Sequence, residues 1–226
     1  MLFSLLRGGN LQDFFISLLL SLPIVFISLS VHETAHGFVA YKLGDPTARN
    51  YGRLTLNPIK HIDPIGFVCM LFFGFGWAKP VPINTRYFKK PRRDMALTGV
   101  AGPISNLLLA VIFALLLRLV FVFCSPLALV DPVTTVDFLW YFLWQMLMLG
   151  MRINITFAVF NMIPIPPLDG SRLLFAFLPP QQYFKFMRYE RYISIALMIA
   201  LFLGLLDTPI NFVTNLFWNL ITRLIF

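Results

Sequence analysis

The chain has 226 residues, of which 58% are hydrophobic and only 12% are charged. Soluble domains carry about 25% charged residues, so the composition excludes an ordinary soluble domain and indicates a polytopic membrane protein. This length allows one membrane-embedded domain, residues 1–226, and we expect no separate folded soluble domain beside it.

The net charge of +8 would also fit a nucleic-acid-binding protein, but the positions of the basic residues argue against one. Ten of the 18 lysines and arginines lie between Lys42 and Arg93, in a loop region between apolar segments. Such an excess is typical of a cytoplasmic loop of a membrane protein. We therefore expect contact with the anionic headgroups of a lipid bilayer, and no nucleic-acid partner.

The first apolar segment predicts a helix from about residue 11 to residue 43, which ends at Gly44-Asp45-Pro46. This helix is longer than the roughly 30 Å hydrocarbon core of a bilayer requires. Between residues 47 and 92, short β-type runs broken by glycine and proline indicate strands. The apolar run Ile65–Trp77 is too short for a normal span. We therefore expect a membrane-associated β-hairpin or re-entrant region between the first two transmembrane helices.

The rest of the chain predicts further helices separated by turns, at residues 94–124, 138–162, 170–178, 192–206 and 209–225. The expected fold class is all-α, with about five to six transmembrane helices. Loop charges predict the orientation. The basic regions 42–93 and 172–191 face the cytoplasm, and the loop 125–137, which has two acids and no base, faces the other side.

The run His32-Glu33-Thr34-Ala35-His36-Gly37 lies in the first predicted helix. Positions i and i+4 share a helix face, so His32 and His36 can direct two imidazoles at one metal ion. Glu33 is offset by roughly 100°, close enough to reach a water on that metal. The pattern matches the zinc protease signature His-Glu-x-x-His. The alternative is a chance match, but ionisable groups after an uncharged apolar run (14–31) are costly and usually functional.

Catalytic zinc takes three protein ligands and leaves one position for water, so two histidines require a third ligand. Asp169 is the best candidate because it follows the third predicted span, where three prolines and Gly170 impose an irregular backbone. On local sequence alone, a cap on the short helix that follows, 170–178, is the favoured role of Asp169. Its expected depth, close to that of His32 and His36, favours metal ligation.

In such a site zinc activates water and polarises a carbonyl, and Glu33 acts as general base. Asn106, one turn after Gly102-Pro103, is a candidate donor to the developing oxyanion. A structural hydrogen bond between membrane helices is the alternative role of Asn106, and both stay open.

Two features of the basic loop region carry weaker hypotheses. His61 could be a metal ligand, but a histidine at the membrane interface is the favoured interpretation. The segment Gly76–Asn84 could present a strand edge to an extended substrate, or it could be a structural strand, and both interpretations stay open. Its prolines remove backbone donors, so only one side of this segment could pair.

Three motifs together resemble the site-2 protease family of intramembrane zinc metalloproteases. They are His32–Gly37, Gly102-Pro103-Ile104-Ser105-Asn106 and the run Asn161–Gly170, in the order the family has them. The resemblance implies that His32, His36 and Asp169 bind one zinc ion and that Glu33 is the catalytic base. It also implies a role for Asn106 near the substrate. The chain resembles the compact prokaryotic type, without a PDZ or CBS domain.

These observations predict an intramembrane endopeptidase that cuts transmembrane segments of single-span membrane proteins. We expect it in a prokaryotic cell membrane, with its active site toward the cytoplasmic side. The alternative is a non-proteolytic membrane metal-binding protein or a transporter. Glu33 discriminates between the two, because binding zinc does not require a base beside the histidines. The sequence leaves the oligomeric state open.

Overall fold

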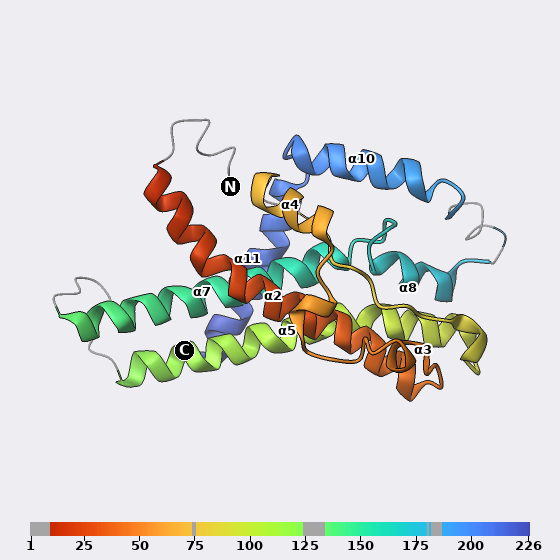
Figure 1. Cartoon of the computed structure of the whole chain (residues 1–226), viewed down its shortest axis with the longest axis horizontal. Helices are drawn as coiled ribbons and strands as arrows, with labels where there is room; N and C mark the ends of the chain where they lie inside the picture. The colour runs from red at the N-terminus through yellow and green to blue at the C-terminus, as the bar shows by residue number, and fades with distance from the viewer. Residues whose placement is uncertain (1–9, 74–75, 124–133, 180, 182–186) are drawn as a thin grey trace.

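The computed structural model describes residues 10–73, 76–123, 134–179, 181 and 187–226, and most of them are helical (Figure 1). The longer helices are α2 (Leu11–Lys42), α5 (Pro91–Phe123), α7 (Thr135–Asn161), α10 (Glu190–Phe202) and α11 (Asp207–Ile225). A shorter helix, α8 (Gly170–Phe177), lies between α7 and α10 in the chain. These bounds confirm the predicted helices to within a few residues.

Local sequence signals set the ends of the long helices. Asn10 caps α2 through its side chain, and Thr134 and Asp137 form a reciprocal capping box at the start of α7. Gly44 follows α2 with a φ of 108°, a left-handed conformation that glycine adopts without strain.

Three helices, α2, α5 and α7, are long and apolar enough to cross a membrane. The number of candidate spans is four if α10 and α11, which are bent by 79° around Gly204, count as one. The 13 residues of α10 extend only about 20 Å, which is less than a hydrocarbon core. The predicted count of five to six spans is therefore unconfirmed.

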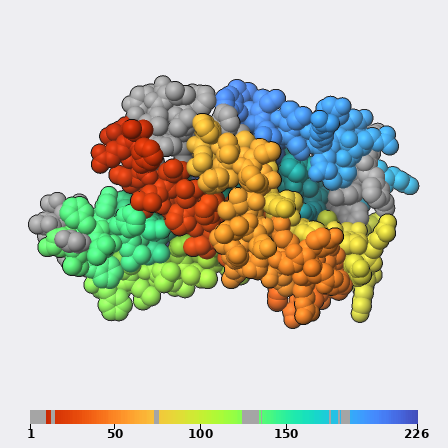
Figure 2. All heavy atoms as spheres, in the orientation of Figure 1, coloured from red at the N-terminus to blue at the C-terminus, as the bar shows by residue number. Residues whose placement is uncertain are grey.

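The region between α2 and α5 differs from the prediction, because its described residues contain no strand. It consists of short helical elements, α3 (Thr47–Asn50), η1 (Pro58–Lys60), α4 (Pro64–Phe73) and η2 (Thr85–Tyr87). A single bridge joins Ile62 to Ala78, so the predicted β-hairpin is not confirmed. The chain does fold back after α4, since Gly76 lies directly against the backbone of Gly66. Figure 2 shows this region, in orange to yellow, covering much of the viewed face.

The helix α5 is the centre of the fold, because it packs against α2, α7, α8 and α11. One cluster of its core joins alanines of α5 to Met151 and Ile155 of α7 and to Ile221 of α11. Small residues on α5 let neighbouring helices approach closely. This packing brings the C-terminal half of α2, the N-terminal half of α5 and the start of α8 to one place. The predicted acidic loop falls largely at 124–133, outside the described residues.

Candidate metal centre

Three predicted ligands meet where α2, α5 and α8 converge. His32 Nε2 lies 3.0 Å from His36 Nε2, and Asp169 Oδ2 lies 2.9 Å from the first and 3.0 Å from the second. All three residues are buried, with at most 7% of each exposed. The three ligand atoms form a triangle and lie close enough together to bind one metal ion.

The other nitrogen of each imidazole has a hydrogen-bond acceptor as its partner. His32 Nδ1 lies 3.2 Å from Asn106 Oδ1, and His36 Nδ1 lies 2.6 Å from the carbonyl oxygen of Thr98. In a neutral histidine these contacts place the proton on Nδ1 and leave a lone pair on Nε2. Two such lone pairs and a carboxylate oxygen converge here, an arrangement that a bound cation stabilises.

The triangle fits zinc. Zinc bonds of about 2.0–2.2 Å in a tetrahedral site set ligand atoms about 3.3–3.6 Å apart, so small outward movements of these side chains admit the ion. Gly102 of α5 provides the room. A Cβ atom at this position would lie within 2.7 Å of His32 Nε2 and would also collide with His36 Nε2.

Asp169 occupies the position before α8, but its side chain does not cap that helix. Its Oδ2 faces the two histidines, and its Oδ1 lies 3.4 Å from Nη1 of Arg172. The structure therefore shows the ligand-like orientation of Asp169 and not the capping role. Burial alone would raise the pKa of this carboxyl, but protonated imidazoles of His36 and His32, through their charge and hydrogen bonds, hold that pKa well below its usual range.

Glu33 lies beside the triangle and is not part of it. Its Oε2 accepts a hydrogen bond of 2.9 Å from the backbone N–H of Val81. Within the described residues, its Oε1 has no hydrogen-bond partner. Glu33 is thus a buried carboxylate next to a metal ligand with one oxygen free.

Asn106 combines features of both predicted roles. Its Oδ1 pairs with His32 across the α2–α5 interface, as an interhelical hydrogen bond would. Its Nδ2 is buried and has no partner among the described residues, so both N–H donors of the amide are left over for another molecule.

The remaining candidate, His61, does not join the metal cluster. It is buried, and its Nε2 lies 2.7 Å from the carbonyl oxygen of Thr55. Sequence reasoning had no signal for the Thr98 carbonyl or the Val81 N–H, because both are backbone groups that tertiary packing brings to the site. Gly102 did carry a signal, since it stands within a motif of small residues.

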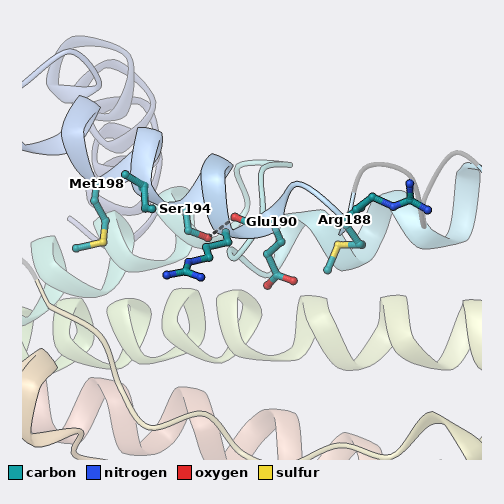
Figure 3. Close-up of a pocket in the computed structure, with 7 residues that line it drawn as sticks. Arg188, Glu190, Ser194 and Met198 are labelled. Atoms are coloured by element: carbon teal, nitrogen blue, oxygen red, sulfur yellow. Dashed lines mark hydrogen bonds between the residues drawn. The ribbon is translucent and has the colours of Figure 1, made fainter.

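Two hollows lie outside the metal centre. One, of about 520 Å³, is lined by α10 and the residues just before it, and Figure 3 shows Glu190 and Ser194 beside it. The other has a similar volume and is lined by apolar side chains of α5, α7 and α11, including Pro103, and of the residues next to α7 and α11, including Met162. Neither contains a second group of metal-binding side chains among the described residues.

Comparison with known proteins identifies the family. The model of peptidase family M50 matches residues 20–206. The chain belongs to peptidase family M50, the site-2 protease family. YwhC of Bacillus subtilis, which is named as a zinc metalloprotease, is 42% identical over 187 residues, covering 83% of this chain and 80% of YwhC. No solved structure matches the chain.

More distant relatives carry the same designation. Rip2 of Mycobacterium tuberculosis is 30% identical over 79% of this chain, and the match covers 64% of Rip2, a little under two thirds. The protein MJ0611 of Methanocaldococcus jannaschii is 30% identical over 67% of this chain and 71% of its own length. All are named as zinc metalloproteases, so the cofactor is zinc, and the cluster of two histidines and one aspartate suits it.

The close approach of α5 leads to a first prediction. We expect Gly102→Ala to weaken zinc binding by at least about tenfold, because the added methyl group displaces both imidazoles. Gly37→Ala is the matched control: Gly37 directly follows His36, yet the nearest atoms to its Cβ would belong to Ala48, Val81 and Leu54, at 3.2–3.5 Å. Zinc titration of both purified variants measures the difference. Equal affinities would show that Gly102 does not make room for the metal site.

Proposed function

We propose that this protein is an intramembrane zinc endopeptidase that hydrolyses peptide bonds in or near the transmembrane segments of single-span membrane proteins. One observation carries the proposal. The buried triangle of His32, His36 and Asp169, with Glu33 beside it, lies at the C-terminal half of α2, a helix that is apolar enough to span a bilayer. Membership of a zinc metalloprotease family supports the same chemistry.

Each residue of the site would have a separate role in hydrolysis. His32, His36 and Asp169 would hold zinc, which when bound activates a water and polarises the peptide carbonyl. Glu33 would accept the proton of the attacking water at Oε1 and pass it to the leaving amine. The Thr98 carbonyl and Asn106 Oδ1 hold the two imidazoles in the tautomer that leaves Nε2 for the metal. The free Nδ2 of Asn106 would donate to the developing oxyanion.

The membrane setting explains the need for such a site. A peptide bond buried in lipid meets little water, and its helix satisfies its own backbone. The enzyme must therefore supply a polar, water-accessible cavity at membrane depth. Basic residues after α2 favour a cytoplasmic position for this end of the helix, so we propose cleavage toward the cytoplasmic side of the cell membrane.

A co-expression assay tests this function. Single-span membrane proteins tagged at both ends are expressed with the wild-type protein or with Glu33→Gln, and fragments are sized by immunoblot. We expect fragments cut within or near the span, on its cytoplasmic side, only with the wild-type protein. If no single-span protein is cleaved while purified protein binds zinc, the alternative of a non-proteolytic metal-binding protein would stand.

The two atoms of the Asn106 amide give separate predictions. Asn106→Asp keeps an oxygen for His32 Nδ1, an arrangement common around zinc, but removes the free donor. We expect it to retain zinc and to lose at least about tenfold in turnover, since removing one oxyanion donor typically costs about 10²–10³ in rate. Asn106→Ala removes both groups and should also weaken zinc binding.

Zinc analysis and turnover, measured on the same detergent-purified preparations, distinguish these outcomes. Wild-type turnover in Asn106→Asp would show that the Nδ2 donor has no catalytic role and would leave Asn106 a structural role only. A structural hydrogen bond between membrane helices contributes on average only about 0.6 kcal/mol to stability.

A further inference from the structure

The backbone N–H of Val81 is the only described hydrogen-bond partner of the Glu33 carboxylate. The bond measures 2.9 Å to Oε2 and is buried at both ends, because Val81 is 5% exposed and Glu33 is 9% exposed. In this buried position the bond restricts rotation of the carboxylate, and Oε1 has no partner in the part of the chain that the structure describes.

The segment that carries this N–H, residues 78–84, is fastened to the rest of the protein on both sides of Val81. The buried Arg53 donates from Nη2 to the carbonyl of Lys79 at 2.5 Å and to that of Pro80 at 3.3 Å. Beyond Val81, the N–H of Asn84 donates to the buried carboxylate of Asp45 at 2.6 Å. Hydrogen bonds on both sides of Val81 therefore hold its backbone in position.

The hydrogen bonds of this segment disfavour its use as a strand edge for substrate. Pro80 and Pro82 have no N–H, Lys79 N–H donates to the carbonyl of His61 at 2.8 Å, and Val81 N–H donates to Glu33. From Lys79 to Pro82 every backbone donor is thus either missing or already used. A β-ladder needs free donors on its edge, and this stretch offers none.

We propose that the Val81 N–H, fixed in place by Arg53, positions the catalytic base: it holds Glu33 Oε2 so that Oε1 faces the water that attacks the peptide bond. Val81 and Arg53 are positioning residues that act through Glu33. This inference rests on the proposed function and identifies which part of the chain orients its base. Misplacement of a catalytic group by about 1 Å can cost about 100-fold in rate, so a bond of this kind has a measurable effect on turnover.

Val81→Pro removes the N–H and tests the proposal directly. Pro82 already restricts Val81 to extended conformations, in which the φ of proline is accessible. Val81→Ala is the matched comparison, because it also loses the valine side chain but keeps the N–H. We expect kcat of Val81→Pro to be at least about tenfold below that of Val81→Ala, with equal KM and equal zinc content by metal analysis.

A second measurement, of thermal stability, does not depend on enzymatic activity. Thermal unfolding of Val81→Pro and Val81→Ala is compared in the wild-type and in the Glu33→Ala background. We expect the proline variant to be the less stable of the two only where Glu33 is present, because the lost bond requires the carboxylate. A difference that persists unchanged in Glu33→Ala would show that the Val81 N–H does not act through Glu33.

Arg53→Met keeps the proposal testable if Val81→Pro does not fold. It removes the donors to Lys79 and Pro80, and Arg49→Met, at an exposed arginine bonded to Tyr41, is its control. We expect a lower kcat with unchanged KM and zinc content in Arg53→Met alone. Equal kcat for Val81→Pro and Val81→Ala, or for Arg53→Met and its control, would overturn this inference. Inactivity of the wild-type protein would instead overturn the proposed function.

Discussion

Asp169→Ala is expected to abolish high-affinity zinc binding and, with it, peptide cleavage. Asp169 provides the single anionic atom of the triangle, 2.9–3.0 Å from both histidine nitrogens. Without it, two neutral imidazoles remain, one ligand fewer than catalytic zinc sites use. Loss of an outer-shell partner already costs about 10–100-fold in affinity, so we expect loss of this ligand to cost at least about 100-fold.

Metal analysis of the purified variant measures this effect, with Asp207→Ala as the control. Asp207 is an exposed carboxylate at the start of α11, outside the metal centre. The control should retain one zinc per chain and wild-type cleavage. Full zinc occupancy in Asp169→Ala would remove Asp169 from the ligand set and would reopen its assignment as a helix cap.

The sequence predicted the long helices and the pair His32 and His36 because these depend on short-range regularities. Continuous apolar runs define α2, α5 and α7, and the spacing i, i+4 alone puts two imidazoles on one face. The local sequence around Asp169 favoured a helix cap, so its assignment as a metal ligand also depended on its expected depth near the two histidines. Only the packing of α8 against α5 turns its carboxylate toward the histidines.

The region between α2 and α5 was predicted less well for a definite reason. Its asparagines cap short 3₁₀ turns: Asn57 accepts from Ile59 N–H, and Asn84 accepts from Arg86 N–H. Proline and β-type residues in the same stretch resembled broken strands. The choice between strand and turn therefore depended on side-chain capping and on long-range contacts, such as that between Val81 and Glu33, which no local pattern contains.

The helix α10 is a second element whose end could not be predicted from hydropathy alone. Its apolar residues continue almost to α11, so hydropathy suggested two separate spans. Gly204, with a φ of 70°, ends α10 and turns the chain by 79° into α11. A glycine in an apolar run does not show from sequence alone whether a helix bends there or ends.

Glu33→Gln is expected to retain zinc and the fold while losing at least about 10²-fold in kcat, the lower range of general acid–base catalysis. The amide has nearly the same shape as the carboxylate, and its oxygen can still accept the Val81 N–H. Zinc binding should persist because Glu33 is not one of the three converging ligands. The amide cannot take a proton from water, so only the rate of the chemical step, and with it kcat, should fall.

Glu190→Gln is the matched control, because Glu190 is the only other glutamate in the chain and lies on α10, outside the metal centre. Purified wild-type, Glu33→Gln and Glu190→Gln proteins are compared for zinc content, thermal unfolding and cleavage of a single-span substrate. Loss of zinc from Glu33→Gln would give Glu33 a role in the metal site itself. Cleavage by Glu33→Gln at the wild-type rate, with zinc bound, would show that another group acts as the base and would leave Glu33 without a catalytic role.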